Sequence, residues 1–339
     1  MLYYHIDKPI ADTKRYPGPI EISGWAFSSE HSIVKVVAVF NNETRINLPL
    51  NKERPDVVKA LGQEKVEIAD SIVGFHHFID EKSIISRPKL KIRLIISDTE
   101  STAESAENMH DLVDEAKLTR SEYKEVWNSE SIDINQAENA IAGYTSQDER
   151  WESSPRRFVE LILKPTVGVK QEDKILEIGA GVGRVGNILA PMCKKWVGAD
   201  VSSNMLGHLH KKLSDTENID TFELNGYNLK GIESNSFDLV YSTIVFMHLD
   251  EWERYSYCKD SFRCLKQGGR IYIDNFNLLD DQGWTFFLEN AAYHPLQRPA
   301  NISKSSTPQE LEAYLIRAGF SDVKIGTYKM WVYGYGVKP

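Results

Sequence analysis

The first hundred residues alternate short apolar runs with turn signals, a pattern typical of an all-β domain. The run KLKIRLIIS (89–97) alternates leucine and isoleucine with lysine and arginine, which is the period of a strand that buries one face. One helix is expected at 54–61, where a proline suits the first turn. We therefore predict a small antiparallel β-sandwich over residues 1–100. Its expected strands are 20–27, 32–40, 44–50, 73–79 and 89–97.

The pattern changes after residue 100. Residues 98–115 are acidic and poor in large apolar side chains, so we expect a linker over residues 101–120. A helical segment is expected over 121–165. In it, Asp133 should cap a helix at 134–142, Gly143 should end that helix, and Pro155 should open the next one.

From residue 166 to 339, apolar strand patterns alternate with helical patterns, which indicates a parallel sheet. The last two strands have almost no loop between them, so they must pair antiparallel. We predict an α/β fold: a doubly wound, Rossmann-like, seven-stranded sheet that ends in an antiparallel hairpin. Its expected strands are 174–178, 196–199, 221–225, 237–242, 270–275, 321–329 and 331–339. A helical pattern begins at Val185, and further helices are expected at 203–213, 251–266 and 307–318.

Composition narrows the class of protein. The net charge of −9 argues against a nucleic-acid partner, since phosphate binding needs clustered basic residues. The three cysteines lack metal-site spacing and are interpreted as reduced thiols of a cytoplasmic protein. No apolar run has the length of about 20 residues that a membrane helix needs, and no signal peptide is evident.

A glycine-rich turn connects the first two parallel strands. The sequence E-I-G-A-G-V-G places Glu177 just before Gly179, Gly181 and Gly183, and the second strand ends at Asp200. Glycines allow a sharp turn and a close approach to a ligand beside a helix N-terminus. A carboxylate at the end of the second strand can accept both hydroxyls of a ribose. The unit therefore predicts a nucleoside-binding site.

The dinucleotide fingerprint G-x-G-x-x-G also fits this turn, through Gly181, Gly183 and Gly186. A carboxylate at Glu177 would be unfavourable beside a pyrophosphate. It suits instead a ligand that has no phosphate and a cationic end.

The turn resembles the first motif of class I S-adenosylmethionine (SAM)-dependent methyltransferases of type 11/12, and FDLVYS and LKQGGRIYI are similar to later motifs of that family. The resemblance covers about residues 155–339 and implies SAM as the cofactor. Where many members carry an adenine-binding acid, this chain has Asn225, so the side chain of Asn225 or a backbone carbonyl would replace it. The expected cofactor-binding residues are Glu177, Gly179, Ala180, Gly181, Gly183, Asp200, Val201, Asn225, Gly226, Tyr227 and Ser242.

The N-terminal order G-W-A-F, R-P-D-V, G-F is similar to β-sandwich modules attached to bacterial glycosyltransferases and methyltransferases of surface-polysaccharide assembly. Trp25, Phe75, His76 and His77 could form a sugar-binding face, or they could be core and edge residues. The module could equally hold the protein in a homo-oligomer.

Acceptor chemistry is expected after the fourth strand and in the insertion 276–304, which is interpreted as an acceptor-binding lid that contains Trp284, Phe286, Tyr293, His294 and Arg298. His248 is a candidate general base, or a residue that only orients the acceptor. No metal site is expected, although Asp274 and Asn275 could bind a divalent ion. The candidate substrate-binding residues are Tyr144, Trp151, Asn275, Trp284, His294 and Arg298.

These features lead to three hypotheses. The first is a SAM-dependent O-methyltransferase that acts on a carbohydrate, either a nucleotide sugar or the end of a surface glycan. The second is a small-metabolite methyltransferase with an oligomerising N-terminal module. The third is a non-catalytic glycan-binding protein.

Overall fold

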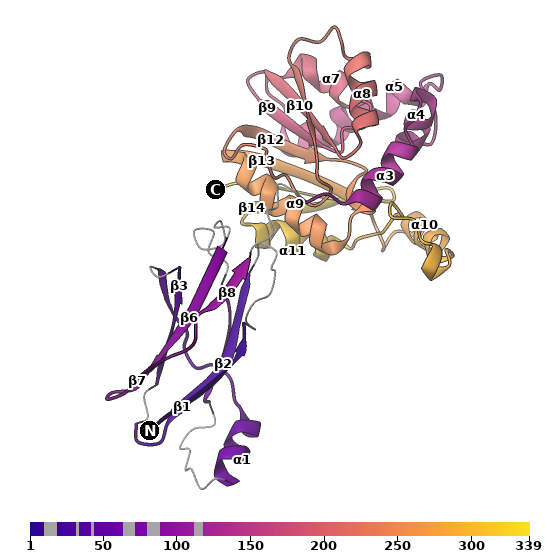
Figure 1. Ribbon diagram of the computed structural model, residues 1–339. Coiled ribbons are helices and arrows are strands. Elements are labelled where there is room, and N and C mark those ends of the chain that lie inside the picture. Colours follow the sequence, from indigo (N-terminus) through magenta and orange to yellow (C-terminus); the bar gives the residue numbers. More distant parts are fainter. Residues whose placement is uncertain (10–18, 32–33, 42–43, 64–71, 80–88, 112–117) are drawn as a thin grey trace. The chain divides into compact units, whose positions relative to one another are not determined.

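The chain forms two compact units, Met1–Lys117 and Leu118–Pro339. We consider each by itself in the computed structural model (Figure 1). The described residues are 1–9, 19–31, 34–41, 44–63, 72–79, 89–111 and 118–339.

The N-terminal unit contains two antiparallel sheets that share one apolar core. One sheet has the order β1-β2-β5, and the other has the order β4-β3-β6-β7, with β8 also paired to β6. In β6, Leu90, Ile92 and Leu94 are each no more than 1% exposed, as the alternation predicts. The expected all-β region is thus confirmed. Its elements are β1 (Leu2–Lys8), β2 (Ile20–Ser28), β3 (Lys35–Phe40), β4 (Thr44–Asn47), α1 (Pro55–Gln63), β5 (Gly74–Ile79), β6 (Lys89–Ser97), β7 (Thr102–Glu104) and β8 (Asn108–Asp111).

Part of the expected linker belongs to this unit. Strands β7 and β8 lie within residues 101–120, and β1 is a strand that the sequence pattern did not suggest. Hydrogen bonds to β6 hold this polar segment in the sheet. The Ser105 N–H donates to the Leu94 oxygen at 2.9 Å, and the Leu94 N–H donates to Ser105 Oγ at 2.9 Å. Residues 112–117 of the expected linker lie outside the described residues.

The four aromatic candidates of this unit have different environments. Phe75 is a core residue with 2% exposure. Trp25 is partly exposed, with its ring centroid 6.4 Å from that of His5. His76 Nε2 lies 3.0 Å from Glu21 Oε1, and His77 Nε2 lies 2.8 Å from the Pro49 oxygen. Both histidines therefore have local structural partners.

The C-terminal unit contains a seven-stranded sheet of order β11-β10-β9-β12-β13-β15-β14. All pairs are parallel except those made by β15, which is antiparallel to both β13 and β14. This confirms the predicted doubly wound sheet with its C-terminal hairpin. The strands are β9 (Lys174–Ile178), β10 (Lys195–Asp200), β11 (Ile219–Glu223), β12 (Phe237–Ser242), β13 (Leu265–Phe276), β14 (Ser321–Tyr328) and β15 (Trp331–Val337).

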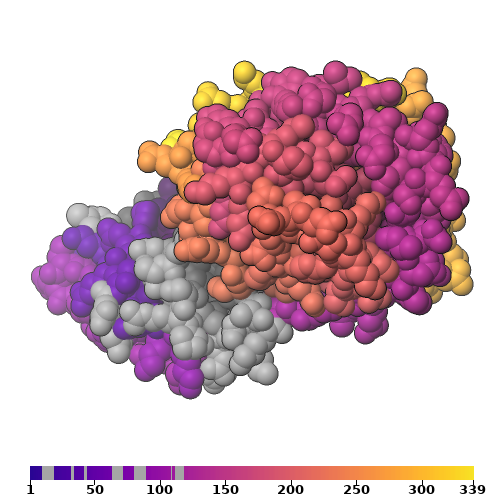
Figure 2. All heavy atoms as spheres, turned by 90° about the horizontal axis from the view of Figure 1, so that it is seen from above, coloured from indigo at the N-terminus to yellow at the C-terminus, as the bar shows by residue number. Residues whose placement is uncertain are grey.

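Helices cover both faces of this sheet (Figure 1). The face that presents Leu176 and Val240 packs against α9 and α11, and the opposite face packs against the segments from η2 to α8. The atoms of residues 121–150 gather along one side of the unit (Figure 2). The helices are α3 (Ser121–Ser129), α4 (Ile134–Ala142), α5 (Arg150–Phe158), η2 (Val159–Leu163), α6 (Lys164–Val167), α7 (Gly186–Leu189), η3 (Ala190–Met192), α8 (Ser203–Lys212), η4 (Phe246–His248), α9 (Glu251–Cys264), α10 (Asp281–Ala291), η5 (Pro295–Gln297) and α11 (Pro308–Ala318).

Capping signals are correct for two helices, and the expected start at Pro155 is wrong. The Asp133 side chain accepts hydrogen bonds at the start of α4, and Gly143 follows that helix with a φ of 75°. The Thr307 side chain caps α11 in the same way. Helix α5 begins five residues before Pro155 because Trp151, which is 2% exposed, is buried in a small apolar cluster beneath it. Pro155 is the sixth residue of α5, where a proline removes one backbone hydrogen bond and crowds the carbonyl four residues earlier, so the burial of Trp151 offsets this cost.

No helix among the described residues is long and apolar enough to cross a membrane.

Candidate functional site

The carboxyl ends of β9, β10 and β12 surround a cavity of about 850 Å³. The strand order reverses between β9 and β12, and ligands of doubly wound folds bind where it does so. The cavity walls also include Trp127 from α3 and Ile141 from α4. We call this space the first cavity.

The glycine turn forms the floor of the first cavity. Gly179, Ala180 and Gly181 line it, but Gly183 does not. A Cβ on Gly179 would lie 2.2 Å from Val245 Cγ2, and the residue has a φ of 76°, so a larger residue cannot replace it without displacing Val245. Gly183 instead makes room for Leu209 of α8, which a Cβ would approach to 3.0 Å. Its role is therefore in packing.

Asp200 lies at the end of β10 and is 8% exposed. Its Oδ2 accepts from the Gly181 N–H at 2.8 Å, and its Oδ1 accepts from the Ser202 N–H at 2.9 Å. Burial raises the pKa of this carboxyl group, while the backbone donors oppose the shift. Each oxygen keeps a further lone pair, so the carboxylate can also accept hydrogen bonds from the hydroxyls of a ribose.

Glu177 is a second buried acid of the same cavity, with 3% exposure. The Tyr241 hydroxyl donates a hydrogen bond to it, and Trp196 Nε1 donates to the Tyr241 oxygen at 3.3 Å. Burial raises the pKa of Glu177 to about 8. A cationic ligand in the cavity would favour its ionised form, whereas a phosphate would oppose it.

Arg184 is a wall residue that the sequence did not suggest. Its Nη1 donates to the Tyr144 hydroxyl oxygen at 3.1 Å, and its guanidinium lies 5.4 Å from the Trp151 ring centroid. Tyr144 and Trp151 therefore hold Arg184 in place and do not line the first cavity themselves. A guanidinium at this wall can pair with a carboxylate of the ligand.

His248 lies in η4, directly after β12. Its Nδ1 is 2.7 Å from the Asn301 carbonyl oxygen, and its ring meets the Trp127 ring edge-on at a centroid distance of 4.9 Å. Because a carbonyl can only accept, Nδ1 must carry the proton and Nε2 the lone pair. Burial lowers the pKa of His248 from 6.5 to about 4, so the ring is neutral at pH 7.

A second cavity, of about 610 Å³, adjoins the first. Trp127, Ala140 and His248 line both. The other walls of the second cavity come from α3 and from the insertion between β13 and α11. They are Glu130, Asn290, Tyr293, Pro299, Asn301, Ile302 and Ser303.

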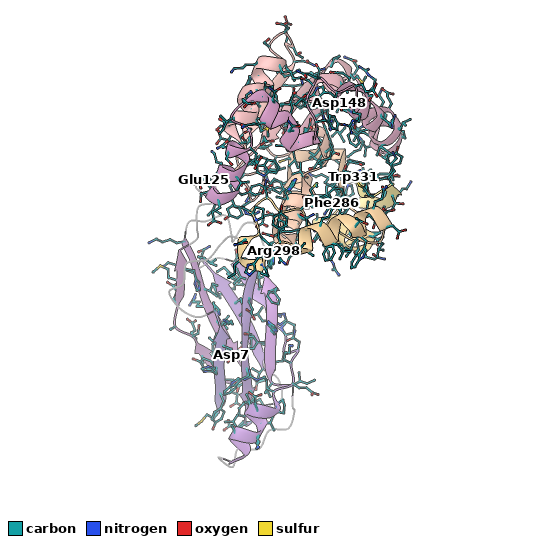
Figure 3. The ribbon with its side chains drawn as sticks, turned by 90° about the vertical axis from the view of Figure 1, so that its right-hand side faces the viewer. Asp7, Glu125, Asp148, Phe286, Arg298 and Trp331 are labelled. Carbon is teal, nitrogen blue, oxygen red and sulfur yellow. The ribbon has the colours of Figure 1, made fainter. Side chains whose placement is uncertain are left out.

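Of the residues suggested for acceptor binding in and next to the insertion, Tyr293 lines the second cavity and the others lie elsewhere. Asn275 is fully buried, and its Nδ2 donates to Ser306 Oγ at 2.7 Å. Trp284 is 48% exposed, and His294 and Arg298 are also exposed; none of the three lines either cavity. Figure 3 shows Arg298 at the edge of this unit, with Phe286 closer to Trp331. Phe276 packs against both of these rings, at centroid distances of 3.9 and 4.5 Å, so the apolar side of α10 is anchored to the sheet.

Besides Gly183, four of the expected cofactor-binding residues do not line the first cavity: Asn225, Gly226 and Tyr227, which form the loop after β11, and Ser242. Asn225 Oδ1 accepts from the backbone N–H groups of Tyr227 and Asn228 at 2.8 and 3.0 Å, and so shapes the turn that contains Gly226. Ser242 is buried and donates to the Ile178 oxygen at 3.2 Å. The apolar side chains of Val201 and of Leu224, the residue just before this loop, line the first cavity.

Among the residues that the structure describes, no group of three or more His, Cys, Asp or Glu side chains could hold a metal ion. Asp274 accepts from Thr243 Oγ1 at 2.6 Å and from the Ile244 N–H at 2.8 Å, so it shapes the loop after β12.

Residues 176–273 match a family model described as a methyltransferase domain. A phosphoethanolamine N-methyltransferase of Plasmodium falciparum (isolate 3D7) is 26% identical over 121 residues, which are 35% of this chain and 44% of that protein. Phosphoethanolamine N-methyltransferase 1 of Arabidopsis thaliana is 27% identical over 125 residues, which are 36% of this chain and 23% of that protein. The chain therefore spans less than half the length of these curated relatives.

Among solved structures, phosphoethanolamine N-methyltransferase 1 of Haemonchus contortus, in complex with phosphoethanolamine and S-adenosylhomocysteine, is similar to this chain. The TM-score is 0.47 at 17% identity, and the match covers 64% of this chain and 48% of that one.

Proposed function

Because the C-terminal unit holds a class I, SAM-dependent methyltransferase domain, we propose that the protein methylates a hydroxyl group of a carbohydrate with His248 as the general base. The observation that carries this proposal is the place of His248, whose ring lines both the first and the second cavity. A base at that junction can reach an acceptor in one cavity and face a methyl donor in the other.

The residues of the first cavity fit SAM. Asp200 can accept the ribose hydroxyls, Glu177 can balance positive charge, and Arg184 can pair with the carboxylate of the amino-acid end. When bound, SAM supplies an electrophilic methyl group on its sulfonium. The protein mainly has to hold the acceptor oxygen in line with that group.

His248 would accept the proton of the acceptor hydroxyl at Nε2, since Nδ1 is engaged with the Asn301 carbonyl. A pKa of about 4 keeps the ring in its basic form at neutral pH but makes it a weak base. Such a base is sufficient if the proton moves as the carbon–oxygen bond forms, because the hydroxyl becomes strongly acidic at that stage. We therefore place proton transfer together with methyl transfer.

The carbohydrate assignment rests on the polarity of the second cavity. Asn290 and Ser303 offer hydrogen-bonding groups, and Tyr293 and Trp127 offer aromatic surfaces for a sugar ring. No lysine or arginine is among its described wall residues. If the acceptor is a nucleotide sugar, its phosphates would remain outside this cavity.

A second candidate function is methylation of a small amine. Two observations favour it: the relatives are named phosphoethanolamine N-methyltransferases, and Glu130 adds a carboxylate to the second cavity. The absence of basic side chains among the described walls disfavours a phosphorylated amine. We further propose that the protein acts in the cytoplasm and that its N-terminal unit binds a glycan or a second copy of the chain.

A product assay with SAM tests both candidates. Purified protein is incubated with neutral sugars, nucleotide sugars, short glycans, ethanolamine and phosphoethanolamine, and the methylated products are identified by mass spectrometry. Methylation of a sugar hydroxyl is expected. Methylation of ethanolamine or phosphoethanolamine in place of any sugar would refute the carbohydrate assignment, and phosphoethanolamine as the preferred acceptor would also refute the electrostatic argument.

A further inference from the structure

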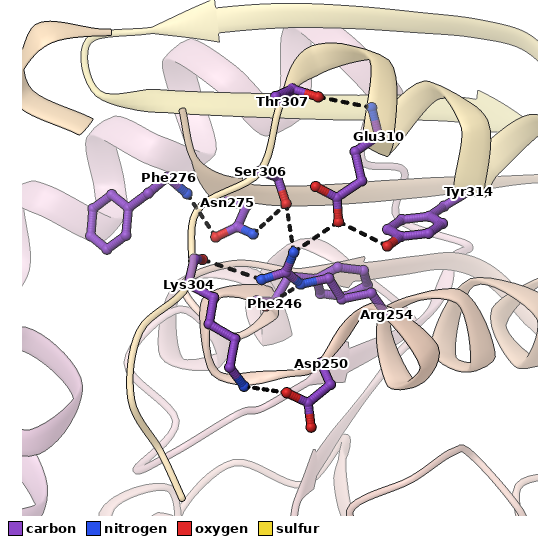
Figure 4. A network of polar contacts seen from close by, with 10 residues as sticks. All are labelled: Phe246, Asp250, Arg254, Asn275, Phe276, Lys304, Ser306, Thr307, Glu310 and Tyr314. Carbon is purple, nitrogen blue, oxygen red and sulfur yellow. Dashed lines mark hydrogen bonds and ion pairs between the residues drawn. The ribbon is translucent and has the colours of Figure 1, made fainter. Parts of the chain in front are cut away.

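Arg254 of α9 is a buried cation that lines neither cavity; it is 3% exposed. Its Nε donates to the Phe246 oxygen at 2.9 Å, and its Nη2 donates to the Lys304 oxygen at 3.2 Å. Its Nη1 donates to Ser306 Oγ at 2.9 Å and to Glu310 Oε1 at 2.8 Å (Figure 4). One guanidinium thus reaches three separate segments of the chain.

Two of these segments hold His248. Phe246 begins η4, the short helix that ends at His248. Residues 301–306, which we call the strap, form the end of the insertion, and the strap includes the Asn301 carbonyl that binds His248 Nδ1. The Lys304 N–H also donates to the Met247 oxygen at 2.7 Å. Arg254 therefore connects the strap to η4 without lining either cavity.

Burial of the Arg254 guanidinium is costly, and four acceptors offset that cost. Burying a charge needs both a partner charge and hydrogen bonds, and Arg254 has a single paired carboxylate, that of Glu310. The network is extended by Asn275, which donates to Ser306 Oγ at 2.7 Å, and by Tyr314, which donates to Glu310 Oε1 at 2.8 Å (Figure 4). An apolar residue at 254 would avoid the desolvation cost, so the bridging geometry is the feature that requires arginine.

We propose that Arg254 is a positioning residue that fixes the strap against η4 and thereby sets the tautomer of His248 and one wall of the acceptor cavity. The catalytic part of this proposal rests on the function proposed above. The position of the strap affects the acceptor cavity directly, because Asn301, Ile302 and Ser303 of the strap line the second cavity. Without the guanidinium, the carbonyls of Phe246 and Lys304 lose a donor. The strap then keeps its backbone hydrogen bonds to Met247 and Phe276 but loses its side-chain connection to η4 and α11.

Displacement of the strap would change the surroundings of His248 in a measurable way. The ring would lose its fixed acceptor at Nδ1 and gain water, and both its tautomer and its pKa would return toward those of a solvated histidine. The titratable and charged groups that face the ring are Lys304 in the strap, Asp250 after η4, Glu130 directly after α3, and Glu177, Arg184 and Asp200 across the first cavity.

The test is an NMR titration of the full-length protein. The His248 imidazole signal is assigned with His248→Asn and followed against pH in wild type, Arg254→Lys and Arg254→Met. The matched control is Arg263→Lys on the same helix. Arg263 donates to the carbonyls of Ile232 and Leu229 at 2.7 and 3.0 Å, and none of these residues lines a cavity.

In both Arg254 variants the imidazole pKa should rise by at least one unit and the Nδ1–H tautomer should no longer dominate. In Arg263→Lys both should stay as in wild type. Calorimetry with SAM serves as the folding check, with affinity expected within about twofold of wild type. If Arg254→Met and Arg254→Lys both bind SAM while His248 titrates as in wild type, Arg254 is a structural residue and the proposal is wrong. If Arg254→Met does not fold, Arg254→Lys alone decides, since it keeps the charge but cannot bridge the three segments.

This readout needs no acceptor, so it separates the two proposals. If wild type methylates nothing, the proposed function fails while the titration still tests the positioning role. Once an acceptor is identified, kcat should be about 10- to 100-fold lower in Arg254→Lys than in wild type. The fall of kcat on the acid side of its pH profile should move to higher pH. An unchanged kcat in that variant would contradict the catalytic part of the proposal.

Discussion

Replacement of His248 by asparagine tests the proposed chemistry most directly. Asparagine can keep a hydrogen bond to the Asn301 carbonyl, but it cannot accept a proton near neutral pH. If His248 is the general base, kcat should fall by about 10²–10⁴-fold. SAM affinity should remain nearly unchanged, because the substitution leaves Glu177 and Asp200 in place. Steady-state kinetics and calorimetry measure the two effects separately.

The pH profile distinguishes a base from an orienting residue. The neutral ring is the active form, and its pKa is lowered to about 4, so wild-type kcat should be independent of this group between about pH 5 and 8 and should fall at lower pH. A fall centred near 6.5 would mean that the imidazole is solvated. A His248→Asn variant within about tenfold of wild type, with the same profile, would refute the base assignment.

The same shift makes a prediction about stability. The folded pKa of about 4 lies below the ordinary 6.5, so the unfolded state binds more protons between these values. Stability from this group is therefore complete above pH 6.5 and is lost as the pH falls through 4, by at most about 3 kcal/mol. Urea unfolding of wild type and His248→Asn at pH 7 and 4.5 should show a smaller loss in the variant. Equal losses would contradict the low pKa.

Three further predictions concern the cofactor and the division of the chain. Asp200→Ala should weaken SAM binding by about 1–3 kcal/mol in calorimetry, and unchanged affinity in a folded variant would place the ribose elsewhere. Arg184→Met should weaken SAM binding by a similar amount but leave adenosine binding unchanged; equal losses for both ligands would show that Arg184 does not bind the carboxylate. Residues 118–339 alone should bind SAM within about twofold of the full chain, and a folded but non-binding fragment would contradict this division.

The sequence predicts best the elements whose signals are local. Strands β9 to β13 follow apolar runs, and the caps at Asp133 and Thr307 follow from the hydrogen bonds that their side chains can make. The glycine turn and Asp200 can be found from the sequence because both lie at the ends of regular strands, and both line the first cavity, where we propose that the cofactor binds. Strands β7 and β8 are missed because their polar residues are held by pairing with β6, which no local pattern reveals.

The acceptor half of the site depends on tertiary contacts and is predicted less well. In the insertion, Trp284 is a candidate because it is a large aromatic residue, yet it lies on the exposed side of α10, while Asn290, which no sequence signal suggests, lines the second cavity. Trp127 lines both cavities, but it lies in α3, a short helix that several other helices separate from β9, the first strand of the sheet. Such residues are brought together only when the segments pack.

The boundary between the two halves also limits what the relatives imply. The matched methyltransferase segment, 176–273, contains Glu177, Asp200 and His248. The residues of the second cavity other than His248 lie outside that segment, in α3 and α4 on one side and in the insertion on the other. The matched segment therefore includes the residues that we propose for cofactor binding and the proposed base, whereas the other residues that we propose for acceptor binding lie in parts of the chain that the family model does not include. For this reason we infer the acceptor from the polarity of the second cavity and not from the names of the relatives.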